Sequence, residues 1–204
     1  MKKFLFSLLI LLSIGSMAQV KLGLKLAPVI SSNRAKNDAQ TVENDGSQMK
    51  FSIGLVADKT LSDTYYLSTG LIYLPKRAAF KNADGTVEEE YKLQYIQIPA
   101  TLKLFTNELA PDMKAYLQVG GALEIKVFDE PEDPSFASVE KFTPIDIPVI
   151  LGGGVEYRIG INTTLFGGVS YQRGLINTVG EAGTGFDDLQ LRSTFFSIDL
   201  GVKF

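Results

Sequence analysis

The sequence contains neither cysteine nor histidine among its 204 residues. Without cysteine, the chain cannot form a disulfide scaffold, a thiolate metal site or the lipid-carrying cysteine of a bacterial lipoprotein. Without histidine, it has no imidazole general base, no histidine-containing catalytic triad and no histidine metal site. Composition therefore excludes many classes of enzyme and metalloprotein, and we expect no catalytic residue, no metal and no cofactor.

Long apolar runs are also scarce. Lys2 and Lys3 precede a short apolar stretch over residues 4–14, and the small residues Ser16 and Ala18 follow it. This stretch is shorter than the roughly 20 residues that a membrane-spanning helix needs, so the pattern predicts a cleaved signal peptide over residues 1–18. Its removal leaves one domain, residues 19–204, and changes the net charge from -3 to about -5, because 18 basic residues then stand against 23 acidic ones.

The remaining sequence alternates between apolar and polar or small residues with the period of a β-strand. In one segment, Phe166 breaks the alternation by falling on the polar side. Eight segments follow the pattern, an even number as closed antiparallel barrels of bacteria require: residues 20–27, 49–55, 65–73, 96–104, 114–126, 145–159, 165–172 and 195–204.

The connections between these segments alternate strictly between long and short. The short turns fall near residues 58–64, 106–113 and 160–162, and the long polar connections near residues 29–48, 76–90, 129–144 and 175–191. This is the pattern of an eight-stranded antiparallel up-and-down transmembrane β-barrel with long extracellular loops. It places the protein in the bacterial outer membrane, with both termini in the periplasm.

A water-soluble eight-stranded barrel also alternates with period two, but its apolar face points inward. Two features favour the membrane barrel. Aromatic residues gather towards the ends of the apolar face, as in interfacial girdles, and glycines are frequent on the other face, where a narrow interior needs small residues. The aromatic residues are Phe51, Tyr65, Tyr73, Tyr157, Tyr171, Phe196 and Phe204, and the glycines include Gly23, Gly54, Gly70, Gly120, Gly152, Gly154, Gly168 and Gly201.

Several short motifs resemble those of the PorT-like small outer-membrane β-barrel proteins of Gram-negative bacteria. Residues 95–99 with Leu102-Lys103 resemble that family's Tyr-Leu-Glu-Ile-Pro strand, although Gln97 replaces the usual Glu. Further resemblance lies in Tyr116 with Gly120-Gly121, in Asp146 with Gly152, Gly154 and Glu156, and in Tyr171 with Gly174-Leu175 and Asn177. The opening strand departs from the family, because Ala27 and Val29 stand where Gly and Asn are expected. The resemblance implies the fold and the compartment, and one branch of the family is associated with protein secretion across the outer membrane.

On this assignment the lumen holds a cluster of charges, which have to pair or keep water because burying an unpaired ion costs several kcal/mol. The structural interpretation is a salt-bridged plug, in which Lys25 and Asp199 pair across the seam between the first and last strands. The functional alternative is a small gated pore, although eight strands leave little room for a channel. The main cluster is Lys25, Lys50, Glu124, Lys126, Glu156, Arg158, Asp199 and Lys203, with Lys21, Lys103, Lys114 and Asp146 on the same face.

The final strand ends on Phe204, which resembles the assembly signal that barrel-insertion machinery reads. We therefore expect contact with that machinery and with outer-membrane lipid and lipopolysaccharide. The acidic loops argue against nucleic-acid binding, because they cannot neutralise phosphates, and the carboxylates of residues 129–133 match no calcium loop.

The sequence favours a structural or loop-mediated binding role without catalysis. Gly152-Gly153-Gly154 lies within a strand segment and lacks the Gly-Lys-Ser/Thr ending of a phosphate loop. The alternatives are an accessory subunit of an outer-membrane secretion or uptake machine, a small gated pore, or a lipid-acting enzyme.

Overall fold

The computed structural model describes residues 20–36, 42–44, 46–82, 88–131, 133, 138–183 and 189–204. The predicted signal peptide lies outside these residues. Within them, no helix has both the length and the apolar character to cross a membrane.

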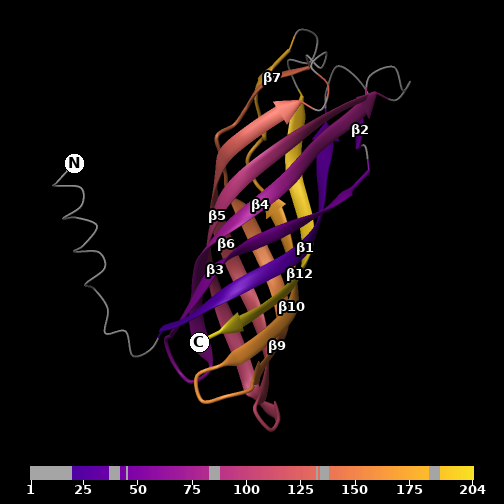
Figure 1. The fold of residues 1–204 in the computed structure, drawn as a ribbon. Helices are drawn as coiled ribbons and strands as arrows, with labels where there is room; N and C mark the ends of the chain where they lie inside the picture. The colour runs from indigo at the N-terminus through magenta and orange to yellow at the C-terminus, as the bar shows by residue number, and fades with distance from the viewer. Residues whose placement is uncertain are drawn as a thin grey trace, which may run out of the picture.

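Eight strands form one closed antiparallel barrel (Figure 1), which confirms the predicted architecture. Each strand pairs with its neighbours in the chain, and the last pairs with the first, from Gly23 opposite Lys203 to Lys36 opposite Gln190. Phe204 extends this seam by donating its backbone N–H to the carbonyl of Leu22 at 2.7 Å. The strands are β1 (Val20–Lys36), β3 (Gln48–Thr60), β4 (Tyr65–Asn82), β5 (Glu88–Ala110), β6 (Met113–Pro131), β9 (Pro148–Arg158), β10 (Thr164–Gly174) and β12 (Gln190–Lys203).

The two ends of the barrel differ. One end carries Lys203 and the short turns of residues 61–64, 111–112 and 159–163, and we call it the terminal end. The other end carries the long connections and is called the loop end; β2 (Val42–Asn44) and β7 (Val139–Phe142) lie there in Figure 1.

Much of what the sequence predicts as long loops is sheet. β1 continues to Lys36, β4 to Asn82, and β5 begins at Glu88. The short strands β2 (Val42–Asn44) and β8 (Ile145–Asp146) extend the sheet along β4 and β6. β7 (Val139–Phe142) and β11 (Val179–Ala182), which come from different connections, pair with each other. A strand needs only about 9–11 residues to cross a membrane, so these long strands continue well beyond it.

The outer wall at mid-barrel is apolar and the interior is charged. Leu117, on the outside of β6, is 67% exposed, whereas Glu124, on the inside of the same strand, is 0% exposed. A water-soluble barrel would have the opposite arrangement, so this wall is suited to contact with lipid. We refer to the exposed apolar residues of the outer wall as the apolar belt; they include Leu24, Leu26, Ile53, Leu55, Leu71, Leu117, Val119, Leu151, Val169, Ile198 and Leu200.

Phe166 is the residue that breaks the alternation of its segment, and it points into the barrel. It lies opposite Gly201 on β12, where a Cβ atom would approach the Phe166 ring to 2.3 Å. The aromatic ring therefore fills the space that the glycine leaves in the lumen.

Leu200 lies near the middle of the apolar belt and tests which face meets lipid. We expect Leu200→Arg to lower the free energy of unfolding by about 2–4 kcal/mol, because a charge near the bilayer midplane loses its hydration. Leu109→Arg is the matched control, since Leu109 is also exposed, at 60% against 51% for Leu200, but lies beside the turn at the terminal end; its cost should be about 0–1 kcal/mol. Urea unfolding in lipid vesicles measures both. Equal costs at the two positions would contradict the lipid-facing belt.

Candidate functional site: the charged lumen

A group of four charged residues fills the lumen towards the terminal end. Asp58 of β3 accepts hydrogen bonds from the ammonium groups of Lys103, at 2.9 Å, and of Lys203. Lys203 also pairs with Glu156 of β9, and the hydroxyl of Ser68 donates to Asp58. We call Asp58, Lys103, Glu156 and Lys203 the terminal-side ion cluster. It ties together β3, β5, β9 and β12.

Aromatic rings pack against the two lysines of this cluster. The Lys103 ammonium lies 5.1 Å from the centre of the Tyr116 ring, and that of Lys203 lies 5.3 Å from the centre of Phe166. Such contacts stabilise a cation that has lost water. The lysines therefore have both carboxylate and aromatic partners.

A second group, the loop-side ion cluster, consists of Lys76, Glu124 and Asp146. The Lys76 ammonium pairs with Glu124, lies 3.4 Å from an Asp146 carboxylate oxygen and donates to the Ser193 hydroxyl at 3.0 Å. Gln97 donates one amide hydrogen to Glu124 at 2.7 Å and another to the side-chain oxygen of Gln172 at 2.8 Å. All of these side chains are buried, so polar contacts span the width of the lumen here.

The seam between β1 and β12 contains the ion pair that barrel closure predicts, with Lys25 Nζ 2.9 Å from an Asp199 carboxylate oxygen. Asp199 also accepts a hydrogen bond from Ser197, and Ser197 contacts Ser170 of β10, each at 2.7 Å. The pair thus belongs to a polar chain that crosses three adjacent strands.

Arg158 lies at the mouth of the lumen and outside both ion clusters, so its predicted place in the lumen charge cluster is wrong. Its side chain is 56% exposed and pairs with Asp112, whose Oδ1 lies 2.8 Å from Arg158 Nε. Asp112 has a left-handed backbone, with φ of 63°, in the two-residue turn between β5 and β6. Arg158 is the last residue of β9, so it has passed the end of the lumen and can reach water and this turn.

Lys126 and Lys50 also lie apart from the two ion clusters. Lys126 contacts Asp129 at 2.8 Å and donates to the Phe142 carbonyl at 2.9 Å, both at the loop end. Lys50 is half-buried on β3, opposite Val29 of β1. Of the eight predicted cluster residues, Glu124, Glu156 and Lys203 therefore belong to the two ion clusters, and Lys25 and Asp199 form the seam pair.

Two residues of these clusters were not predicted, Asp58 and Lys76. The sequence assigns Asp58 to a turn and Lys76 to a long loop, but both lie within strands. Asp58 continues the inward phase of Gly54 and Val56, and that phase is the signal that could have placed it in the lumen.

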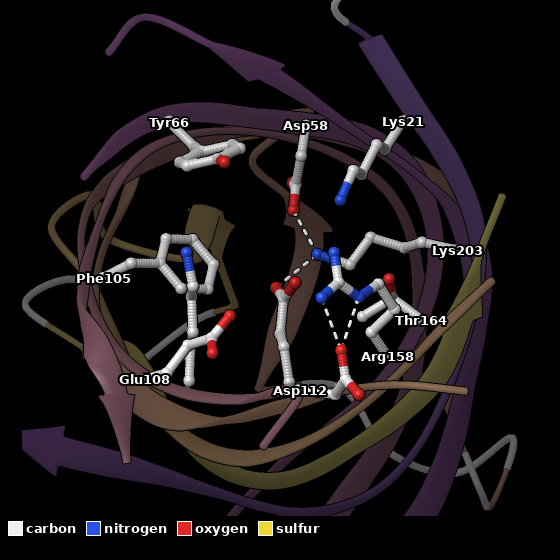
Figure 2. Close-up of a pocket in the computed structure, with 11 residues that line it drawn as sticks. Lys21, Asp58, Tyr66, Phe105, Glu108, Asp112, Arg158, Thr164 and Lys203 are labelled. Carbon is white, nitrogen blue, oxygen red and sulfur yellow. Dashed lines mark hydrogen bonds and ion pairs between the residues drawn. The ribbon is translucent and has the colours of Figure 1, made fainter. Parts of the chain in front are cut away.

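A cavity of about 200 Å³ opens below the terminal-side ion cluster at the terminal end (Figure 2). In Figure 2, Lys203 and Asp58 point towards one another within it, and Arg158 pairs with Asp112 beside them. Both charge signs line the cavity, together with two aromatic rings whose centres lie 4.8 Å apart. The lining residues are Lys21, Asp58, Tyr66, Phe105, Glu108, Asp112, Lys114, Glu156, Arg158, Thr164 and Lys203.

In both ion clusters a lysine ammonium lies between two carboxylates. Lys203 pairs with both Asp58 and Glu156, and Lys76 with both Glu124 and Asp146. Within the described part of the chain, no three acidic side chains are grouped so that they could hold a metal ion. The clusters neutralise charge and fill space.

An apolar outer wall around a charged, filled interior is the signature of a small outer-membrane barrel. In agreement, the family model described as "outer membrane protein beta-barrel domain" matches residues 16–180. The chain belongs to this family. Membership places the barrel in the bacterial outer membrane.

Two solved structures of outer-membrane proteins share the fold. Neisserial surface protein A is 20% identical, with a TM-score of 0.50, and the match covers 90% of this chain and 97% of that one. Outer membrane protein AlkL, solved in lipid bilayers, is 13% identical, with a TM-score of 0.52 and coverage of 94% and 92%. No curated protein matches the sequence. At these identities the likeness concerns the fold alone.

The terminal-side ion cluster can be tested by removing one charge. We expect Asp58→Asn to lower the free energy of unfolding by about 3–5 kcal/mol, because it leaves buried lysines without their shared carboxylate. Glu181→Gln is the matched control, since Glu181 pairs with Lys141 at 3.1 Å on the surface, where an ion pair contributes only about 0–1 kcal/mol. Urea titration followed by gel migration of the folded form gives both values. Unchanged stability of Asp58→Asn would show that the cluster does not hold the barrel together.

Proposed function

We propose that the protein is a closed outer-membrane barrel that presents an ordered binding surface outside the cell. This surface, which we call the loop-end platform, consists of β7 and β11 and the residues that anchor them. The observation that carries the proposal is the pairing of β7 with β11, which joins the third and fourth long connections into one small sheet.

An apolar core lies beneath the platform and fixes it to the barrel. Tyr91 and Phe142 meet edge to face, with their ring centres 5.0 Å apart. Such packing holds β7 and β11 against the barrel, because apolar burial and aromatic contacts offset the entropy that ordering these strands costs. The core residues come from both the barrel and the platform: Ala78, Phe80, Tyr91, Leu93, Tyr95, Val139, Phe142, Val179, Leu189 and Leu191.

Buried hydrogen bonds also fix how the segments around this core are oriented. Glu89 of β5 accepts bonds from the backbone N–H of Ser138 at 3.2 Å, from its hydroxyl at 2.9 Å and from the Tyr91 hydroxyl at 2.6 Å. Asn177 accepts from the Leu191 N–H at 2.9 Å and donates to the Leu189 carbonyl at 3.2 Å. Pre-ordered strands of this kind suit recognition, since less entropy is lost when a partner binds.

The interior supports binding rather than transport as the main role. Two ion clusters and the apolar core succeed one another along the lumen, and eight strands enclose little more than their own side chains. The absence of histidine and cysteine supports a role without catalysis.

A PorT-like assignment within the family is part of the proposal, and the structure gives its motif residues a physical role. Tyr95 and Asp146 contact Lys76, whose ammonium lies 4.8 Å from the centre of the Tyr95 ring, and Gln97 donates to Glu124, the partner of Lys76. At Gly174 a Cβ atom would come within 2.5 Å of an Asp146 carboxylate oxygen. Gln97, where the family usually has Glu, avoids a further negative charge beside Glu124. These motif residues thus form the loop-side ion cluster or contact it.

We further propose that the loop end faces the outside of the cell and that the terminal end, with both termini, faces the periplasm. Long loops outside and short turns inside are the rule for bacterial barrels. Because the chain has no native cysteine, single cysteines can be placed at will. Lys141 on β7 and Ile161 in the turn between β9 and β10 are both exposed, at opposite ends.

We expect Lys141→Cys to react with a membrane-impermeant maleimide on intact cells, whereas Ile161→Cys should react only after the outer membrane is permeabilised. Heat-modifiable gel migration of each variant checks that the barrel has folded. Labelling of Ile161→Cys but not of Lys141→Cys in intact cells would reverse the orientation and refute a platform displayed outside.

A further inference from the structure

Three arginines gather on the outer wall at the loop end, on the adjacent strands β1, β12 and β10. Arg34 lies directly opposite Arg192 in the β1–β12 ladder. Arg173 lies opposite Thr194, two residues from Arg192, which makes it the diagonal neighbour of Arg192 on the same face. All three are exposed and line a hollow of about 200 Å³ together with Ser32, Asn33, Tyr171 and Thr194.

This arrangement is unfavourable in the absence of an anion. Like charges directly opposite in an antiparallel sheet repel one another and destabilise the pair. Within the residues that the structure describes, no carboxylate forms an ion pair with any of the three arginines. A bound anion would turn the repulsion into attraction, and planar guanidinium groups match the oxygens of a phosphate in a bidentate manner.

The position of the arginines relative to the apolar belt indicates where that anion comes from. Apolar side chains on the outward face lie on the terminal-end side of each arginine. Tyr171 is two residues from Arg173, Phe196 is four residues from Arg192, and Ile30 is four residues from Arg34. At about 3.3 Å per residue, the guanidinium-bearing residues lie roughly 7–13 Å beyond the last apolar side chains. Lipid headgroups occupy this zone beyond the hydrocarbon.

We propose that Arg34, Arg173 and Arg192 form a binding site for the phosphate group of an anionic membrane lipid. The arginines hold the phosphate, while Tyr171, Phe196 and Ile30 contact the beginning of the acyl chains. A free phosphate ion would gain nothing from these apolar neighbours, which is why the lipid is the favoured source. Placing the site in the outer leaflet rests on the proposed orientation of the barrel, but the site itself does not.

Titration of the full folded chain in non-ionic detergent micelles tests the proposal. The probes are dihexanoyl phosphatidic acid, dihexanoyl phosphatidylcholine and inorganic phosphate, and native mass spectrometry measures the bound fraction. We expect phosphatidic acid to bind best, and the double variant R173Q/R192Q to bind it at least about tenfold more weakly, since each basic residue near anionic lipid contributes on the order of a tenfold factor or somewhat less.

The control variant K59Q/K92Q removes two positive charges elsewhere, because Lys59 is exposed at the terminal end and Lys92 is exposed on β5 at the loop end; it should bind phosphatidic acid as the unchanged protein does. R173Q/R192Q should also unfold at no lower urea concentration than the unchanged protein without anionic lipid, because it removes repulsion. Equal phosphatidic acid binding by R173Q/R192Q and the unchanged protein would overturn the site. Inorganic phosphate binding as tightly as phosphatidic acid would overturn the lipid assignment. Neither outcome depends on which way the barrel faces.

Discussion

Closure of the barrel with only eight strands is the constraint on which the other features depend. In hydrocarbon, every backbone N–H and C=O group has to be paired within the protein, so β12 has to close on β1. Eight strands then enclose a space that only side chains can fill. Each inward residue therefore needs a partner across the lumen, and each buried charge needs a counter-charge.

The ion clusters and the glycines are two responses to the same lack of space. Lysines with long side chains reach across the lumen, as Lys203 does to Asp58 and Glu156. Glycines on neighbouring strands make room for large inward rings, as Gly201 does for Phe166. The interior thus combines small and large residues in the proportion that its width allows.

The kind of residue that points inward changes along the barrel. On β5, the inward residues are polar within the apolar belt, as at Gln97 and Lys103, but apolar at the loop end, as at Tyr91 and Leu93. On the terminal-end side of this change the outer wall faces lipid. On the loop-end side the strands surround an apolar core like that of a water-soluble protein. This change gives β7 and β11 an apolar core to pack against at the loop end.

That change also explains how far the sequence alone could predict the structure. The eight strands, their closure and the pair of Lys25 with Asp199 follow from a period of two and an even strand number. The sequence pattern predicts loops for the upper parts of β4 and β5, because the simple alternation of apolar and polar residues ends there. On β5 the apolar Tyr91 and Leu93 point inward while Lys92 is exposed, and on β4 both Ala78 and Ala79 are buried. Lys76 lies in this upper part of β4, so the sequence pattern predicts it in a loop.

Other features could not be predicted because they depend on contacts between distant segments. The pairing of β7 with β11 joins two connections that are separated by β9 and β10 in the chain. Arg158 has the inward phase of its strand, but the strand ends there and the turn at Asp112 offers a nearer carboxylate. The alternation of inward and outward side chains does not show at which residue the lumen ends.

The central claim is that buried ion pairs close the lumen, so that function resides at the loop end. Single-channel current recording in planar lipid bilayers tests this claim most directly. The refolded protein, with insertion verified by heat-modifiable migration, should give no steady current across the bilayer. A stable conductance that changes when Lys76 is replaced by alanine would show that ions pass through the lumen, and would contradict the account.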